Sequence, residues 1–383
     1  MPKICCRRGG MMKIISAIDS MKGSLSSVEA NKIIEEVFMS EEVQVKKIAI
    51  ADGGEGTVEA FITNYTGQYE QISCQNLRGK VGTSFFGWLA QEKIAVIESA
   101  LTCGIQFLDG TDRTHPSQTN SAGLGESILA ALDKGAKTII IGLGGTGTVD
   151  GGMGAMHALG VEFFDISGNV LSPKGENLGL VRQVSKENLD ARVNNVEFII
   201  AADVESPLTG PTGAVYMFGT QKGIKQEELK TYETMMINYE QVLLDGDTPQ
   251  KGDGAAGGLG IALRKLLNAK MVRGFDLIAH YSALEEEIRT ADLVITGEGK
   301  IDSQSLQGKV PIGIGQIAKK YQLPVIAFVG SVEGDPAIFH LNGLDVVIPI
   351  VDRISSLGEA MKNAKGNLKR AAMRTKQLLF LLK

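Results

Sequence analysis

The chain alternates short apolar runs with amphipathic helical patterns, and this alternation restricts the possible folds more than any other feature of the sequence. Near the N-terminus, a buried strand at residues 13–18 precedes a loop and a helix at 26–39. Ser26 and Glu29 form a capping-box pattern at the start of that helix. The next strand is expected at 48–51, again before a loop and a helix. Such alternation is typical of βαβ units, so the sequence predicts an α/β protein with a mostly parallel sheet.

The same alternation returns near the C-terminus. Strands are expected at residues 293–296, 325–329 and 346–350, a helix is expected at 310–321, and a long helix ends the chain. Because these strands resemble those at the N-terminus, the two ends of the chain can share one sheet.

The chain is too long for a single hydrophobic core. It has 383 residues, and single cores stop growing near roughly 250–300 residues. The middle of the chain is less regular, and its strand-like stretches at 81–89 and 94–98 look antiparallel. The sequence therefore predicts a first domain at 12–70 and 285–383, a second α/β domain inserted at 71–284, and a disordered N-terminal extension at 1–11.

Composition disfavours several classes of protein. The formal net charge of -5 gives no basic surface for nucleic acid, so no nucleic-acid partner is expected. Apolar stretches such as 138–145 and 323–330 are far shorter than the roughly 20 residues that cross a bilayer, so no membrane partner is expected. The four cysteines show neither a zinc spacing nor a disulfide framework. We therefore expect a cytoplasmic location.

Glycine is unusually frequent and concentrates in loops after the expected strands. It accounts for 47 of 383 residues, which is about 12% against a typical 7%. Ligands of open α/β sheets bind beyond the carboxyl ends of the strands. The loop after the first strand contains Asp19, Lys22 and Ser24 and leads into a helix whose N-terminal amides favour anions. A phosphate or carboxylate can bind there, although a plain turn capped by Asp19 explains the pattern equally well.

The loop that begins at Asp52 is denser in charge and glycine than a turn requires. Asp52, Gly53, Gly54 and Glu55 are followed by a third glycine and a threonine. A purely structural turn needs only one or two glycines, so we predict a ligand-binding function for this loop.

Residues 142–152, with the sequence GLGGTGTVDGG, give the strongest single signal. Glycines let backbone N–H groups approach phosphates closely. The P-loop pattern is absent, and no acidic residue at a following strand end completes a dinucleotide fingerprint. We predict a nucleotide phosphate cradle that includes Gly144, Gly145, Thr146 and Asp150.

Three later segments have the same loop character. Asp203 follows an apolar strand at 198–202, which makes it a candidate metal ligand or base. Lys222 stands between glycines at 219–223 and can either bind a ligand or be solvated. The turn at 253–260 opens a helix with small residues, and close helix packing explains it as well as a ligand does.

The segment from 296 to 309 combines acidic and basic side chains. Glu298 and Asp302 alternate with Lys300, and Lys309 precedes the next helix. Magnesium binds few carboxylates and completes its coordination with water and phosphate oxygens. Two carboxylates and two lysines among glycines therefore predict a magnesium–phosphate site.

Seven motifs follow one another in a fixed order along the chain: DSMKGSLSSVEA, ADGGEGTVEA, GLGGTGTVDGGMGA, ADVESPLTGPTGA, FGTQKG, GAAGGLG and ITGEGKIDSQSLQGK. Their order and spacing resemble the class I glycerate kinase family, and the resemblance extends from about Met12 to the C-terminal helix. It implies a flavodoxin-like parallel-sheet domain formed by both chain ends and an inserted α/β domain related in outline to restriction enzymes. The active site would then lie in the cleft between these domains. The implied reaction is the transfer of a phosphoryl group from ATP, with Mg²⁺, to D-glycerate, with 2-phosphoglycerate rather than 3-phosphoglycerate as product.

On this interpretation, the residues expected to be catalytic are Asp203, Asp302, Lys22, Asp19 and Asp52. Substrate or nucleotide binding is expected of Ser24, Gly53, Gly54, Glu55, Gly144, Gly145, Thr146, Asp150, Lys222, Glu298 and Lys309. Asp203 or Asp302 would bind the metal or act as the base for the attacking hydroxyl group, and the sequence does not separate these two roles. Lys22 and Lys309 would contact phosphate or the substrate carboxylate.

Two other functions remain open. A kinase of another small hydroxy acid or a sugar would use the same nucleotide-binding residues, and this chain departs from the family pattern at 120–125, Val149 and 205–206. A non-catalytic sensor of nucleotide or hydroxy acid is the second alternative, but the expected carboxylates are all present. The sequence does not determine the oligomeric state, and a homodimer is one option.

Overall fold

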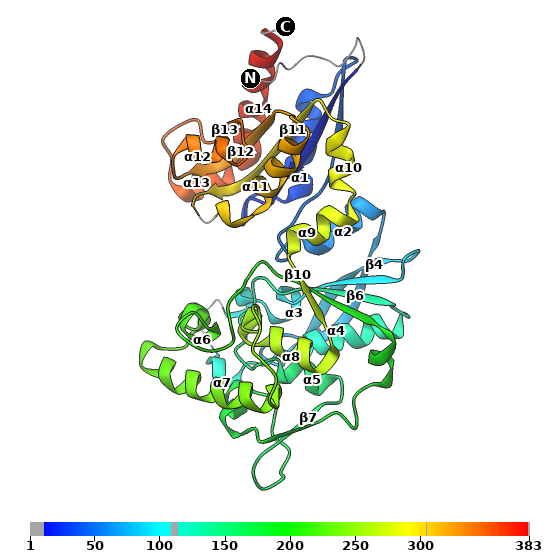
Figure 1. Ribbon diagram of the computed structural model, residues 1–383, viewed down its shortest axis with the longest axis vertical. Helices are drawn as coiled ribbons and strands as arrows, with labels where there is room; N and C mark the ends of the chain where they lie inside the picture. The colour runs from blue at the N-terminus through cyan, green and yellow to red at the C-terminus, as the bar shows by residue number, and fades with distance from the viewer. Residues whose placement is uncertain (1–10, 109–113, 304, 382–383) are drawn as a thin grey trace. The chain divides into compact units, whose positions relative to one another are not determined.

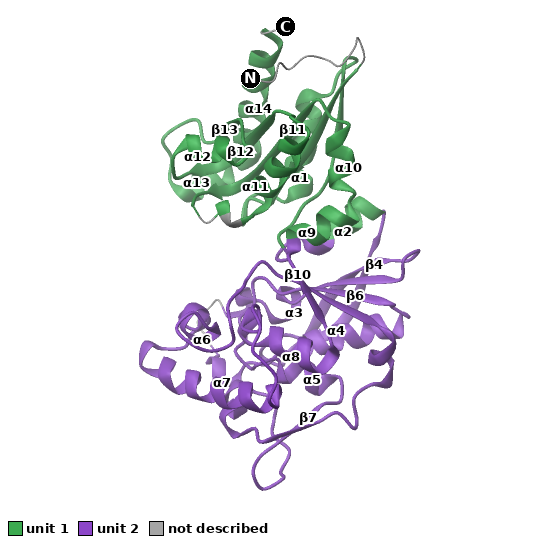
Figure 2. Ribbon diagram, in the orientation of Figure 1, with its two compact units in different colours: residues 1–52, 59–65, 275–383 green, residues 53–58, 66–274 purple. Residues whose placement is uncertain are grey.

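The computed structural model describes residues 11–108, 114–303 and 305–381 (Figure 1). These residues form helices and β-sheets, which confirms the predicted α/β class. The predicted N-terminal extension lies outside the described residues except for Met11. The chain divides into two compact units (Figure 2): unit 1 is Met1–Asp52, Glu59–Tyr65 and Phe275–Lys383, and unit 2 is Gly53–Val58 and Thr66–Gly274.

Unit 1 is built on a five-stranded sheet whose neighbouring strands all run parallel. Strands from the two ends of the chain share this sheet, as the sequence pattern predicts, and β1 lies between β11 and β2. Ile14 and Ile15 of β1 point to opposite faces of the sheet, and both are buried, as is usual for parallel sheets covered on both sides. The order across the sheet is β13 (Val346–Pro349), β12 (Val325–Val332), β11 (Leu293–Ile301), β1 (Met12–Ile18) and β2 (Val43–Lys47).

The strand predicted at 48–51 is wrong, because β2 ends at Lys47. The predicted residues are buried, but they extend beyond the sheet. The side-chain amide of Asn64 takes the place of a neighbouring strand: Ala49 N donates to Asn64 Oδ1 at 3.0 Å, and Asn64 Nδ2 donates to the Ala49 carbonyl oxygen at 2.9 Å.

The first helix of unit 1 begins at a side-chain cap. The predicted capping box is confirmed, because Ser26 Oγ accepts a hydrogen bond from Glu29 N and Ser26 N donates to Glu29 Oε2, both at 3.3 Å. Ile14, Phe328 and Leu368 belong to one core that joins the sheet to α1 and α14. The helices that lie wholly or mostly in unit 1 are α1 (Ser27–Phe38), α2 (Thr57–Tyr65), α9 (Gly274–Tyr281), α10 (Leu284–Arg289), α11 (Val310–Lys320), α12 (Pro336–Leu341), α13 (Leu357–Lys362) and α14 (Ala364–Leu381).

Unit 2 contains a six-stranded mixed sheet with a separate core. The predicted strands at 81–89 and 94–98 are confirmed as β4 and β5, and they pair antiparallel as expected. The order is β10 (Lys270–Val272), β9 (Glu197–Ala201), β6 (Thr138–Gly142), β5 (Ile94–Glu98), β4 (Val81–Leu89) and β3 (Gln68–Gln75). A small antiparallel pair is formed by β7 (Glu162–Phe164) and β8 (Gln183–Ser185).

Helices of unit 2 pack their apolar residues against this sheet. The core includes the single tryptophan of the chain, Trp88, together with Leu124, Met236 and Leu263. The helices are α3 (Ala100–Cys103), α4 (Ala122–Asp133), α5 (Met153–Ala158), α6 (Ala214–Phe218), α7 (Leu229–Leu244) and α8 (Leu259–Leu267). Among the described residues, no helix is both long enough and apolar enough to cross a membrane.

Candidate active site

Loops at the carboxyl ends of the unit 1 strands surround a pocket of about 670 Å³. Asp19 directly follows β1, Ile350 directly follows β13, and Glu298 and Ser331 lie in the second halves of β11 and β12. This is the edge at which open α/β sheets bind ligands. Predicted site residues that line the pocket are Asp19, Lys22, Ser24, Asp52, Glu298 and Lys309.

Asp19 is a buried carboxyl group of this pocket. Its side chain is buried, and one carboxyl oxygen accepts a 2.7 Å hydrogen bond from Ser20 N. Burial raises the pKa of Asp19 well above its usual value, and the charge of Asp52 raises it further. Lys22 Nζ lies 3.1 Å from Asp52 Oδ2 and partly offsets this effect. The pocket therefore places a readily protonated carboxyl group beside an ion pair.

Glu298 provides a second buried carboxyl group. Burial raises its pKa, although the Ser305 hydroxyl group donates a 2.7 Å hydrogen bond to Glu298 Oε1 and Lys309 contributes a favourable charge. Asp302 lies close to it, because Ser305 N donates to Asp302 Oδ1 at 3.3 Å. Lys300 Nζ lies 3.3 Å from Asp302 Oδ2. Ser305 thus connects two of the predicted acidic residues.

In unit 2, the glycines of two predicted ligand loops pack against each other. A side chain at Gly144 would place its Cβ 2.5 Å from Gly54 Cα, and one at Gly142 would place it 2.7 Å from the Gly53 carbonyl oxygen. Gly53 itself has φ +87° and lies equally close to the backbone of Ala201. Close backbone approach therefore explains these glycines without a ligand.

Asp150 fixes the end of the glycine-rich segment. Its carboxylate is fully buried and accepts hydrogen bonds from Ser121 N (2.7 Å), Ser121 Oγ (2.8 Å), Gly152 N (3.1 Å) and Gly154 N (3.1 Å). Burial raises the pKa of Asp150 despite these donors. Its contacts connect residues 150–154 to the start of α4.

Lys222 lies beneath the same segment rather than in solvent. Its ammonium group donates to Thr146 Oγ1 at 3.3 Å and to the Thr148 carbonyl oxygen at 3.0 Å. Burial lowers the pKa of Lys222 from 10.5 to about 8, although the charge of Asp150 opposes this change. Within the part of the chain that the structure describes, the buried hydroxyl group of Thr148 has no hydrogen-bond partner. A buried cation next to an unpaired donor is a suitable environment for an anion.

The sequence model described as the glycerate kinase family matches residues 14–380. The chain belongs to the glycerate kinase family. The predicted family and the prediction of a kinase are both confirmed. Glycerate kinase from Bacillus subtilis (strain 168) is 39% identical over 94% of this chain and 96% of its own length. Glycerate 2-kinase from Escherichia coli (strain K12) is also 39% identical, with the same coverage.

A solved structure supports the same assignment. The crystal structure of a Salmonella typhimurium LT2 protein that carries the name glycerate kinase 2 matches with a TM-score of 0.85 and 37% identity. The match covers 97% of this chain and 99% of that one. Family membership therefore extends through both units.

The predicted metal ligands of this glycerate kinase family member belong to different units. Asp302 is in unit 1, whereas Asp203 is in unit 2. Asp203 is exposed, and its Oδ1 accepts a 2.8 Å hydrogen bond from Gly274 N. Glu55 is exposed as well. Across the described ranges, no three Asp, Glu, His or Cys side chains form a ready-made metal site.

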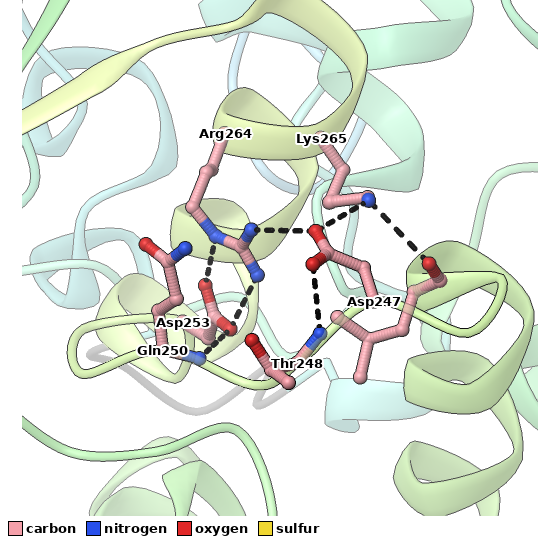
Figure 3. Close-up of polar contacts among 7 residues, drawn as sticks. Asp247, Thr248, Gln250, Asp253, Arg264 and Lys265 are labelled. Atoms are coloured by element: carbon pink, nitrogen blue, oxygen red, sulfur yellow. Dashed lines mark hydrogen bonds and ion pairs between the residues drawn. The ribbon is translucent and has the colours of Figure 1, made fainter.

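Packing accounts for the turn at 253–260, for which ligand binding was the alternative. Asp253 is fully buried, and Arg264 Nε and Nη2 donate to its two oxygens at 2.7 and 2.8 Å (Figure 3). Gln250 N adds a 2.7 Å hydrogen bond. A Cβ at Gly257 would lie 2.1 Å from the Thr148 carbonyl oxygen. The turn thus packs against the backbone of the glycine-rich segment at Thr148.

The sequence analysis missed the apolar part of the unit 1 pocket. Val351, Leu357, Ala360 and Met361 line it, yet they occur in ordinary helical and strand patterns that carry no sign of ligand binding. It also missed the role of Ser121 as the main partner of Asp150.

Proposed function

We propose that this protein transfers the terminal phosphoryl group of ATP to a hydroxyl group of D-glycerate, with Mg²⁺, to give 2-phosphoglycerate. The observation that carries the proposal is the unit 1 pocket, in which Asp19, Asp52 and Glu298 lie with Lys22 and Lys309. Phosphoryl transfer requires positioning and charge neutralisation, and these residues can contribute to both. The name of the E. coli relative, glycerate 2-kinase, supports the 2-position.

The strand order supports a more specific description of unit 1. Counted within this unit alone, the strands β2, β1, β11, β12 and β13 run in the order 2-1-3-4-5. This is the order of flavodoxin-like sheets, so we propose a flavodoxin-like domain. The likeness of the inserted domain to restriction enzymes, and the domain boundaries at 70/71 and 284/285, remain predictions.

A divalent cation fits the donor set of the pocket. Burial raises the pKa values of Asp19 and Glu298, and neighbouring carboxylates raise both further. A cation would relieve this repulsion, and Mg²⁺ prefers oxygen ligands that include one or two carboxylates. Asp302, which lies beside Glu298 in unit 1, is the proposed protein ligand, and Asp203 of unit 2 is the alternative. When bound, the ion would neutralise charge on the phosphate oxygens.

Asp19 is the proposed proton acceptor. General bases work best when their pKa lies near the operating pH, and burial moves the pKa of Asp19 in that direction. As the glycerate oxygen bonds to the terminal phosphorus, its proton passes to the Asp19 carboxylate. The bond between phosphorus and the bridging oxygen breaks, and ADP leaves. Lys22 and Lys309 would hold phosphate oxygens or the glycerate carboxylate through charge-assisted hydrogen bonds.

The unit 2 loops complete the proposed binding residues. Lys222 supplies a buried positive charge next to Thr146 and Thr148, which supports a role in binding phosphate. Further residues of this proposal are Ser24 in unit 1 and Gly53, Gly54, Glu55, Gly144, Gly145 and Asp150 in unit 2. Gly53 and Gly144 already pack closely against neighbouring backbone, so any phosphate contact would have to use their other side.

Product analysis tests the proposal. Protein incubated with MgATP and D-glycerate should yield the ³¹P NMR signal of 2-phosphoglycerate, and EDTA should abolish it. A 3-phosphoglycerate signal would refute the proposed position, and turnover only with another hydroxy acid would refute the proposed acceptor.

Cys74 and Cys103 are free and buried, which is compatible with the predicted cytoplasmic location. A homodimer remains a prediction.

A further inference from the structure

The unit 1 pocket has two chemically different walls. Charged groups gather where Asp19, Asp52 and Glu298 lie. The other wall is formed by the segment after β13 together with α13 and the start of α14. Apart from Ser355, its lining residues are apolar: Ile350, Val351, Leu357, Ala360, Met361 and Ala364. These six side chains are called the apolar wall below.

The position of α13 determines the apolar wall. Ser356 and Glu359 form a capping box at its start, which fixes where the helix begins. Leu357, Ala360 and Met361 then stand at i, i+3 and i+4, so they share one face. The terminal methyl group of Met361 lies so close to Gly23, which has φ +75°, that a Cβ there would be 2.8 Å from it. Met361 of the apolar wall therefore packs against the loop that contains Lys22.

Part of the apolar wall remains uncovered in the protein alone. Leu357 exposes 77% of its surface although it borders a pocket. Leaving a leucine in water forgoes up to about 1.5–3 kcal/mol of burial. D-Glycerate cannot cover it, because every carbon of glycerate carries an oxygen. The second substrate of a kinase, a nucleotide, has a large flat base that can.

We infer that the apolar wall binds the base and ribose of the nucleotide, with its phosphates directed toward Lys22 and Lys309. This inference rests on the proposed function. It assigns a different part of the nucleotide to each end of the pocket. The nucleoside contacts α13, and the transferred phosphoryl group lies at the carboxyl ends of β1 and β11. The pocket volume of about 670 Å³ lies within the 300–1,000 Å³ typical of small-molecule sites.

Two variants test the assignment without disturbing the core. Leu357→Ser removes an exposed apolar side chain, and Ala360→Trp fills the space in front of the apolar wall. Leu341→Ser is the matched control, because Leu341 is also exposed, on α12, and is not among the pocket-lining residues. Binding of ADP and of inorganic tripolyphosphate, each with Mg²⁺, is measured by calorimetry on the full chain.

Leu357→Ser should weaken ADP binding about fivefold, as expected for losing roughly half of a leucine contact, and Ala360→Trp should weaken it more. Tripolyphosphate binding should stay unchanged in both, and Leu341→Ser should change neither ligand. Equal loss of both ligands, or no change in ADP binding, would overturn the assignment. If ADP binds as expected but glycerate is not phosphorylated, the proposed function fails while the nucleoside site stands. Absence of ADP binding in the unaltered protein would refute both.

Discussion

Lys222→Met should change how the stability of unit 2 depends on pH. In the folded protein, burial lowers the pKa of Lys222 from 10.5 to about 8. The unfolded chain therefore binds a proton between about pH 8 and 10.5 that the folded chain has released. Below pH 8 the full cost of burying the ammonium charge is present, and stability rises as the pH increases from 8 to 10.5.

The size of the effect follows from the two pKa values. At about 1.36 kcal/mol per pH unit, the difference between 10.5 and about 8 corresponds to about 3 kcal/mol. Between about pH 7.5 and 10, the expected gain is about 2 kcal/mol, because the titration of the unfolded chain has begun by then. Methionine has a similar volume but no charge, so the variant should lack this gain.

The free energy of unfolding can be measured by urea titration at several pH values. Trp88 is the only tryptophan and is buried in unit 2, so its fluorescence reports the unit that contains Lys222. When the free energy of unfolding of Lys222→Met is subtracted from that of the unaltered protein at each pH, the contributions of other titrating groups cancel to first order. These groups include Cys103, whose pKa burial raises to about 12.

Lys270→Met serves as the control, since the Lys270 side chain is 72% exposed, and it should follow the unaltered protein. The same pH dependence in Lys222→Met and in the unaltered protein would show that the ammonium group reaches water, and the buried-charge account of the glycine-rich segment would be refuted.

Three further perturbations give separate outcomes. Arg264→Met should lower the free energy of unfolding by about 3–5 kcal/mol, because it leaves the buried Asp253 carboxylate without its cation, and a loss below about 1 kcal/mol in urea titration would contradict this. Asp19→Asn should reduce kcat by about 100-fold or more if Asp19 is the base. In the unaltered protein, kcat/KM should rise with pH through the raised pKa of Asp19, and the account is wrong if the variant keeps that rise. Mg²⁺ should raise the melting temperature, and Asp302→Asn should reduce this shift, whereas an unchanged shift would remove Asp302 from the metal site.

Periodicity was sufficient to predict most of the fold. The strands at 81–89 and 94–98 and the helix opened by Ser26 form where expected, because each pairs a clear apolar pattern with a turn or capping residue. The strand at 48–51 failed, since its apolar run is buried beyond the sheet and hydrogen-bonded by Asn64. A side chain distant in sequence can satisfy backbone groups without leaving a local signal.

The site was only partly predictable. Acidic residues such as Asp19 and Glu298 can be recognised because charge near a strand end is unusual unless it has a function. Glycine gave an ambiguous signal: Gly54 and Gly144 allow two backbones to touch, and the sequence alone does not distinguish this from phosphate binding. The apolar wall was missed because Leu357 and Met361 look like ordinary helix residues.

The central claim is that this chain phosphorylates D-glycerate at the expense of ATP. Its most direct test is ADP release from purified protein with MgATP, followed in a coupled assay with and without D-glycerate, with L-glycerate and EDTA as controls. The account predicts ADP release that requires both D-glycerate and the metal. Tight ATP binding without ADP release for any hydroxy acid offered would contradict it.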